Sequence, residues 1–164
     1  MSVPQREPVH TDFTTLACRR AVEHRATWMG LIYAEAKKHA AEAEDICRKA
    51  ILQCGLIHGE GYKADCSDPD SAASFGKALF HEQTTKTMEV NTVEADNDHL
   101  IVEFYHCPLV CAWEKLGFSG AELELLCDIA MDGDRGIAEA MGLSLDLQNT
   151  IAQGHEKCRL HFYK

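Results

Sequence analysis

The segment His106-Cys107-Pro108 carries the residue types best suited to chemistry in this sequence. Pro108 favours the first position of a helix, which makes Cys107 the predicted N-cap. The free backbone N–H groups and the positive end of the helix dipole at that position stabilise a thiolate, the reactive form of cysteine. We therefore expect a lowered pKa for Cys107 and a nucleophilic sulfur, with His106 as a proton carrier. Ordinary burial is the alternative for this thiol.

Three carboxylates follow in quick succession at Asp128, Asp132 and Asp134. A calcium loop of the EF-hand type is excluded, because Gly136 and Leu143 stand where it needs acidic ligands. On a continuous helix, Asp128 and Asp132 would face the same way. These two are predicted as catalytic acids or bases, and Asp134 as a substrate anchor, with turn and cap chemistry as the alternative.

Two arginines and several further thiols extend this set. Arg135 and Arg159 are predicted to bind a substrate carboxylate, because the planar guanidinium matches it. A second interpretation is a zinc site, since Cys111 lies one helical turn after Cys107. Its four candidate ligands would be Cys107, Cys111, His155 and Cys158. The spacing of the last two is not that of a standard zinc finger, so we expect no cofactor, with zinc as the alternative.

The elements that must position these residues begin with helices. Thr11 or Asp12 is the predicted N-cap of the first helix. A second helix is predicted over 43–55, with Cys47 and Cys54 on its buried face. Three glycines that follow are predicted to end it, before a loop at 66–70 and a short helix opened by Pro69. These glycines are Gly55, Gly59 and Gly61.

Alternating apolar residues predict two hairpins, one joining 85–94 to 100–105 and one joining 143–147 to 158–163. Between them, one helix runs from Pro108 to a stop at Gly117. A capping box of Ser119 and Glu122 begins the next, which is expected to break at 132–134 before a short helix over 135–141. The predicted class is α+β: N-terminal helices, then two β-hairpins forming an antiparallel sheet with helices between them. Residues 1–11 are expected to be a flexible N-terminus and 12–164 a single domain.

Composition excludes several classes of function. The net charge of -10, from 16 basic and 26 acidic side chains, opposes binding to nucleic acid. No apolar run approaches the roughly 20 residues needed to span a bilayer. The N-terminus lacks the apolar stretch of a secretory signal, so we expect a cytoplasmic protein with eight reduced thiols. The expected partners are a small-molecule substrate and, in a homo-oligomer, further copies of the chain.

The sequence resembles the L-2-amino-thiazoline-4-carboxylic acid hydrolase family, most clearly from about residue 84 to the end. The resemblance rests on His106-Cys107-Pro108-Leu109, Trp113, the run from Cys127 to Asp134, and Gly154…Cys158-Arg159-Leu160-His161-Phe162.

This resemblance implies hydrolytic opening of a small cyclic amidine or thiazoline ring, giving an N-carbamoyl amino acid such as N-carbamoyl-L-cysteine. In the implied site, Cys107 attacks the ring carbon between nitrogen and sulfur, and Trp113 joins the substrate-binding residues. The Cys-Pro junction is also similar to domains related to 4-vinyl reductases. That likeness keeps open a non-enzymatic small-molecule-binding or sensor domain. A zinc-dependent hydrolase is a further alternative.

Overall fold

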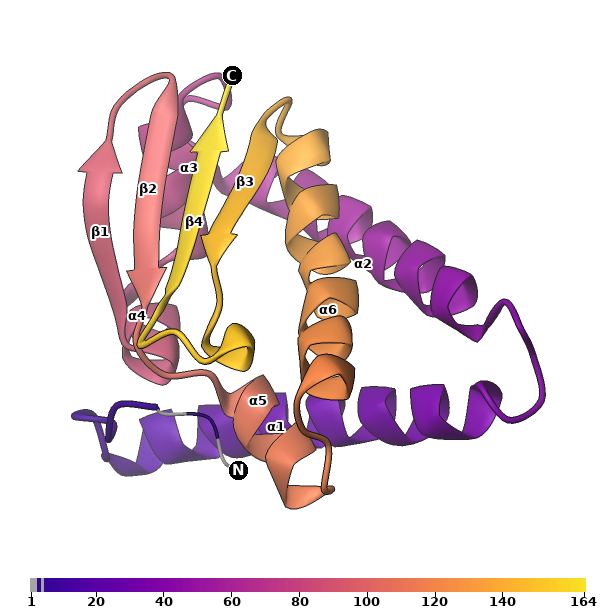
Figure 1. Ribbon diagram of the computed structural model, residues 1–164. Coiled ribbons are helices and arrows are strands. Elements are labelled where there is room, and N and C mark those ends of the chain that lie inside the picture. Colours follow the sequence, from indigo (N-terminus) through magenta and orange to yellow (C-terminus); the bar gives the residue numbers. More distant parts are fainter. Residues whose placement is uncertain (1–2, 4) are drawn as a thin grey trace.

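The computed structural model describes residues 3 and 5–164 and confirms the predicted α+β class (Figure 1). Four helices come first, a hairpin follows, and two further helices separate it from the last two strands. The elements are α1 (Phe13–Ala36), α2 (Ala43–Asp65), α3 (Ala72–Leu79), α4 (Glu82–Met88), β1 (Val90–Ala95), β2 (His99–Phe104), α5 (Pro108–Lys115), α6 (Ala121–Ala140), β3 (Ser144–Asn149), the 3-10 helix η1 (Ile151–Gln153) and β4 (Cys158–Tyr163).

The strands form one antiparallel sheet in the order β1-β2-β4-β3, so that β2 and β4 join the two hairpins at its centre. Leu100 pairs with Phe162, and Phe104 with Cys158. Alternate residues face the core, because successive side chains of a strand point to opposite faces. Phe162 is completely buried there, and Phe75 of α3 meets its ring edge-on, with the centroids 5.2 Å apart. Cys158 lies on the same buried face of β4 as Phe162 and is therefore inside the protein.

Several local signals are confirmed. Asp12 is the N-cap of α1 and accepts a hydrogen bond from the backbone N–H of Thr15 at 3.1 Å. Pro108 begins α5, with Cys107 as its N-cap. Gly117, with φ of 91°, follows the end of α5 in the left-handed conformation that glycine adopts most easily.

The glycines of the second helix do not end it, and this prediction is wrong. α2 continues to Asp65, and α6 likewise runs unbroken through the segment 132–134, where a break was predicted. The reason is tertiary packing: a Cβ atom on Gly55 would lie 2.1 Å from the carbonyl oxygen of Gly133. Each helical glycine costs about 1 kcal/mol of helix propensity. The close α2–α6 contact that they allow offsets this cost.

Three further local predictions are wrong. The strand expected over 85–94 begins only at Val90, because the residues before it form α4 and Glu89 ends that helix at φ of 51°. Gly120, without a side-chain cap, begins α6 in place of Ser119. Cys54 is exposed and Cys47 is only partly buried, because α2 presents its glycines rather than these thiols to α6.

Among the residues that the structure describes, no helix is both long enough and apolar enough to cross a membrane.

Candidate active site

Cys107 lies where the chain leaves β2 and enters α5, as the sequence predicts. The residue is buried, and this burial raises the pKa of its thiol well above the ordinary value. The neighbouring thiols Cys158 and Cys127 act in the same direction. The backbone N–H groups of Val110 and Leu109, at the start of α5, act in the opposite direction but do not offset the loss of water. The predicted lowering of the pKa of Cys107 is therefore wrong.

Three buried thiols come together here from three elements. Cys107 begins α5, Cys127 lies on α6 and Cys158 begins β4. Burial raises the pKa of Cys127 to about 12 and that of Cys158 to about 11. The Sγ atom of Cys158 accepts the backbone N–H of Ile151 at 3.3 Å, and Thr150 contacts the thiol of Cys127. We call Cys107, Cys127 and Cys158 the thiol cluster.

A cleft of about 270 Å³ opens beside the thiol cluster, between α6 and the β3–η1 segment. Cys127 is the member of the cluster that lines it, together with Thr150 of the loop that follows β3. This volume lies just below the range of about 300–1,000 Å³ typical of ligand pockets, so the cleft suits a small molecule. Its walls are formed by Glu124, Leu125, Cys127, Asp128, Leu147, Thr150 and Gln153.

The sequence singled out neither Cys127 nor Thr150 as a site residue. Cys127 follows the apolar spacing of its helix and therefore resembles an ordinary core position. The nearest available signal was the position of Cys127 directly before Asp128 in the acidic run.

Asp128, which lines the cleft, belongs to a network of charged side chains. Arg135 donates to Asp128 at 2.6 Å and to Asp132 at 2.5 Å, and Arg48 of α2 donates to the same two carboxylates at 2.7 and 3.0 Å. Partial burial opposes ionisation of Asp128, but the hydrogen bonds from Arg135 and Arg48 hold its pKa below the usual range. The predicted catalytic carboxylates thus neutralise the predicted substrate-binding Arg135. The sequence does not single out Arg48, although Glu44 one turn before it indicates an exposed ion pair.

The remaining predicted substrate-binding residues are dispersed. Burial raises the pKa of Asp134 to about 6, and the charge of Arg25 opposes this rise. Arg159 points to the opposite face of the sheet from Cys158 and donates to Glu103 at 2.7 Å. Trp113 is buried between α5 and α1.

No hydrogen bond among the described residues joins the His106 side chain to the thiol cluster. The charges that act on His106 are those of Arg19, Glu89, Glu23 and Glu7, whereas the charges that act on Cys107 are the other thiols. Burial lowers the pKa of His106, and its Nδ1 atom has no hydrogen-bond partner among the described residues. The neutral imidazole is therefore favoured at physiological pH.

The alternative zinc ligands are not assembled as a metal site. Cys111 accepts a hydrogen bond from Gln5 at 3.4 Å, and His155 lies exposed in the turn before β4. Among residues 3 and 5–164, no group of three or more histidine, cysteine, aspartate or glutamate side chains is placed to hold a metal ion.

The N-terminal segment covers the start of α5. The side-chain carbonyl of Gln5 accepts the backbone N–H of Cys107 at 3.0 Å, and the backbone N–H of Val3 donates to Glu114 at 2.6 Å. These contacts place Val3 and Gln5 against α5, beside Cys107.

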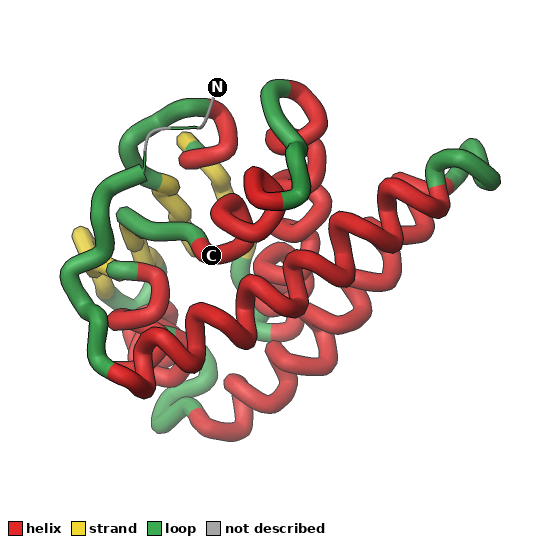
Figure 2. The backbone as a smooth tube through the Cα atoms, turned by 90° about the horizontal axis from the view of Figure 1, so that it is seen from below, coloured by secondary structure: helices red, strands yellow, loops and turns green. Residues whose placement is uncertain are grey.

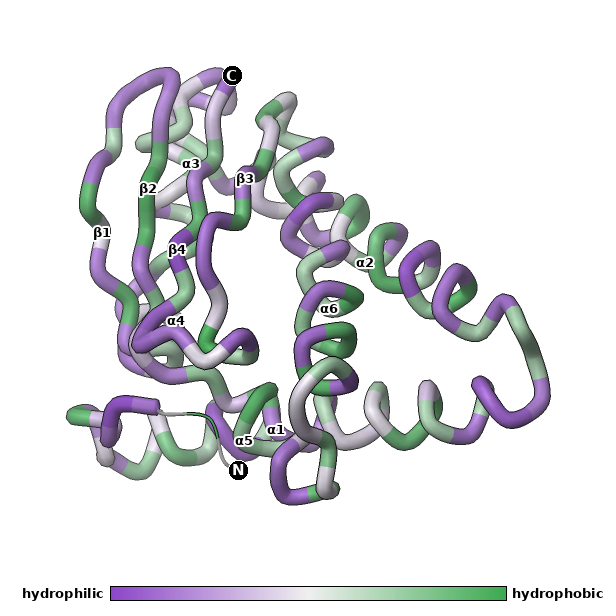
Figure 3. Tube along the Cα trace, viewed as in Figure 1, coloured by the Kyte–Doolittle hydropathy of each residue, from purple (hydrophilic) through white to green (hydrophobic). Residues whose placement is uncertain are grey.

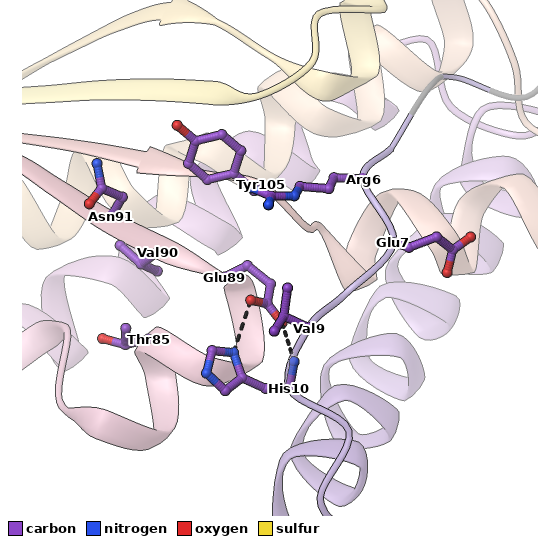
Figure 4. Close-up of a pocket in the computed structure, with 9 residues that line it drawn as sticks. All are labelled: Arg6, Glu7, Val9, His10, Thr85, Glu89, Val90, Asn91 and Tyr105. Carbon is purple, nitrogen blue, oxygen red and sulfur yellow. Dashed lines mark hydrogen bonds and ion pairs between the residues drawn. The ribbon is translucent and has the colours of Figure 1, made fainter.

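Glu89, at the end of α4, joins the same segment to α1 through hydrogen bonds and an ion pair. It also lines a second, smaller cleft of about 150 Å³ (Figure 4). Its carboxylate accepts the backbone N–H and Nδ1 of His10, both at 2.9 Å, and binds Arg19 at 2.7 Å. In Figure 4, His10 points at this carboxylate, while Glu7 is directed away. Burial opposes the charge of Glu89, but its hydrogen bonds with His10 and Arg19 hold the pKa below its usual value.

We expect Glu89→Gln to lower the free energy of unfolding at pH 7 by about 2–3 kcal/mol, because it leaves the buried Arg19 without a counter-charge. The folded pKa of Glu89 is depressed, so its stabilisation is complete above the unfolded pKa of about 4.3 and is lost as the pH falls through the folded value. Urea unfolding measures the difference in the free energy of unfolding between the wild type and Glu89→Gln. This difference should be smaller below pH 4 than at pH 7.

Glu82→Gln is the matched control, because the exposed Glu82 pairs only with Lys86. It should leave the free energy of unfolding nearly unchanged, because an ion pair in water contributes little to stability. Equal losses for the two variants would contradict the role of Glu89.

Comparison with known proteins gives one family and one related fold. A family model described as L-2-amino-thiazoline-4-carboxylic acid hydrolase matches residues 19–162. A trafficking protein particle complex subunit 3 from Naegleria fowleri, covalently bound to palmitic acid, has a similar structure, with a TM-score of 0.60. The two chains are 10% identical over 88% of this chain and 95% of that one, so the likeness shows the fold alone. No curated protein matches the sequence.

Proposed function

Since the chain belongs to the L-2-amino-thiazoline-4-carboxylic acid hydrolase family, we propose that it is a hydrolase that opens a small cyclic amidine or thiazoline ring. The observation that carries this proposal, beyond the family, is the thiol cluster beside a small cleft. A representative substrate is 2-amino-thiazoline-4-carboxylate, and the product is then N-carbamoyl-cysteine.

In the proposed reaction, the sulfur of Cys107 attacks the ring carbon that lies between nitrogen and sulfur. The bond from that carbon to the ring sulfur breaks, and the ring sulfur takes up the proton that Cys107 has lost. Water then adds to the same carbon, Cys107 leaves as a thiol, and the carbon becomes the carbonyl of the N-carbamoyl product. One water molecule is consumed, and no oxidant or reductant is needed.

Backbone groups and one carboxyl support this assignment of roles. The N–H groups of Val110 and Leu109 favour the thiolate of Cys107, although burial outweighs them in the resting protein. The raised pKa of the buried thiol means that a base must remove its proton as the substrate binds. Asp134, whose pKa burial raises to about 6, is the proposed base, and its charge acts on Cys158 of the thiol cluster. Asp128 lines the cleft and is held there by Arg48 and Arg135.

Ring opening can be tested by a screen of thiazoline, imidazoline and oxazoline carboxylates with the purified chain. We expect at least one ring to be opened, with a mass gain of one water in the product and, for thiazolines, release of a thiol that a colorimetric thiol reagent detects. A protein that is folded, as shown by its circular dichroism, but opens none of these rings would contradict the hydrolase proposal.

A second candidate function is the binding of an acyl chain at the thiol cluster. It is favoured by the fold shared with a protein that is covalently bound to palmitic acid, and by the burial of all three thiols. An intact mass larger than that of the sequence by one acyl chain, and reversed by hydroxylamine, would support this candidate. The unmodified mass after expression in eukaryotic cells would oppose it.

A further inference from the structure

Helix α1 turns its large apolar side chains outward. The residues on its inner side are small or polar, apart from one tyrosine: Thr15, Arg19, Ala26, Gly30 and Tyr33. Those on the opposite side are large and exposed to 83%, 37%, 62%, 52% and 60%, in the order Phe13, Leu16, Trp28, Leu31 and Ile32. We call these five residues the α1 outer face. A surface helix normally has the reverse arrangement, with its apolar stripe toward the core.

The inner side of α1 is already matched to its neighbours. Trp113 of α5 donates its indole N–H to the carbonyl of Ala26 at 2.8 Å, and a Cβ on Gly30 would lie 3.0 Å from the same ring. Figure 2 shows α1 lying along the lower side of the molecule, in the view from below. Hydrophobic residues recur along its whole length (Figure 3). The α1 outer face is therefore an uncovered surface.

We propose that the α1 outer face is the contact surface of a homodimer, in which α1 packs antiparallel against α1 of a second copy. Because large apolar side chains offer about 150–250 Å² each, the five exposed fractions together leave on the order of 500 Å² uncovered. The largest apolar patch of a typical soluble monomer covers about 300–600 Å² and is often functional. With the exposed Ala17, Ala21 and His24 between them, these residues supply a large part of the roughly 800 Å² that each partner buries in a stable interface.

A two-fold symmetric contact presents the same side chains from both copies, so the apolar side chains of one α1 outer face meet those of the other. The carboxylate near the end of α1 is already engaged within the chain, because Glu35 pairs with Lys38 and His39. The net charge of -10 disfavours the negatively charged surface of a lipid bilayer as the occupant.

Sedimentation velocity of the full chain at micromolar concentrations tests this interface. We expect a dimer, and we expect Leu31→Glu to weaken association by on the order of 100-fold, since it places two like charges in an apolar contact. The matched control is Ile57→Glu, because Ile57 is 63% exposed on α2, outside the α1 outer face. This control should remain dimeric.

Tryptophan fluorescence provides a second readout that does not depend on the charge substitution. Of the two tryptophans, Trp113 is buried within the chain and Trp28 lies on the α1 outer face. Dilution should therefore shift the emission of the wild-type chain to longer wavelength, and Trp28→Phe should abolish this dependence. A monomer at all concentrations, or a dimer unaffected by Leu31→Glu, would overturn the proposal. So would a monomer that binds phosphatidylserine vesicles through Trp28.

Discussion

A Cys107→Ser protein should open the ring at least about 1,000-fold more slowly than the wild type, because serine presents a far weaker nucleophile at the start of α5. The rate is measured with the substrate identified by the ring screen, under saturating and limiting concentrations. Cys107→Ala should be equally inactive. Its apolar side chain avoids the cost of burying a hydroxyl, so loss of activity in this variant is not a consequence of unfolding.

Two other thiols provide matched controls for Cys107. Cys54→Ser should keep the wild-type rate, because Cys54 is exposed on α2. Cys127→Ser should reduce the rate by no more than about 10-fold, since Cys127 lines the cleft without a role in bond formation. If Cys127→Ser is as inactive as Cys107→Ala, Cys127 of α6 is a candidate nucleophile in place of Cys107. If Cys107→Ser keeps full activity, Cys107 is not the nucleophile.

Gly55→Ala should destabilise the fold by at least about 3 kcal/mol, a large part of the 5–15 kcal/mol typical of a domain. The added Cβ would lie 2.1 Å from the carbonyl oxygen of Gly133, and backbone atoms cannot move aside as a flexible side chain can. Relief of this clash requires α2 and α6 to separate. Urea unfolding followed by circular dichroism measures the loss.

Gly61→Ala is the control on the same helix, because no atom lies within 4 Å of the Cβ that it adds. It should raise the free energy of unfolding by up to about 1 kcal/mol through helix propensity. Similar destabilisation by both substitutions would show that glycine acts through the backbone of α2 and not through its contact with α6.

Local sequence signals predict much of this fold. The cap at Asp12, the proline that begins α5 and the alternating residues of β2 and β4 each act within a few positions, so a single sequence reveals them. The α2 glycines led to a wrong prediction for the same reason, because glycine on its own favours the end of a helix. The contact that keeps α2 helical joins Gly55 to Gly133, which lies 78 residues away along the chain.

The candidate site is only partly predictable from the sequence. The N-cap position of Cys107 follows from Pro108, but the pKa of its thiol depends on how much water the folded chain removes. The neighbours of the thiol, Cys127 and Cys158, come from distant elements. Likewise, the predicted availability of Arg135 for a substrate ignores the pairing with Asp128, which the continuous α6 makes geometrically favourable.

The proposed reaction requires that Cys107 become covalently attached to the ring carbon during turnover. The most direct measurement is mass spectrometry of wild-type protein quenched by acid within the first turnover, followed by peptide mapping. We expect a mass increase equal to the whole substrate, located on the peptide that contains Cys107 and absent from Cys107→Ala. Rapid ring opening with an unmodified Cys107 at every quench time, together with full activity of Cys107→Ser, would contradict the proposed reaction.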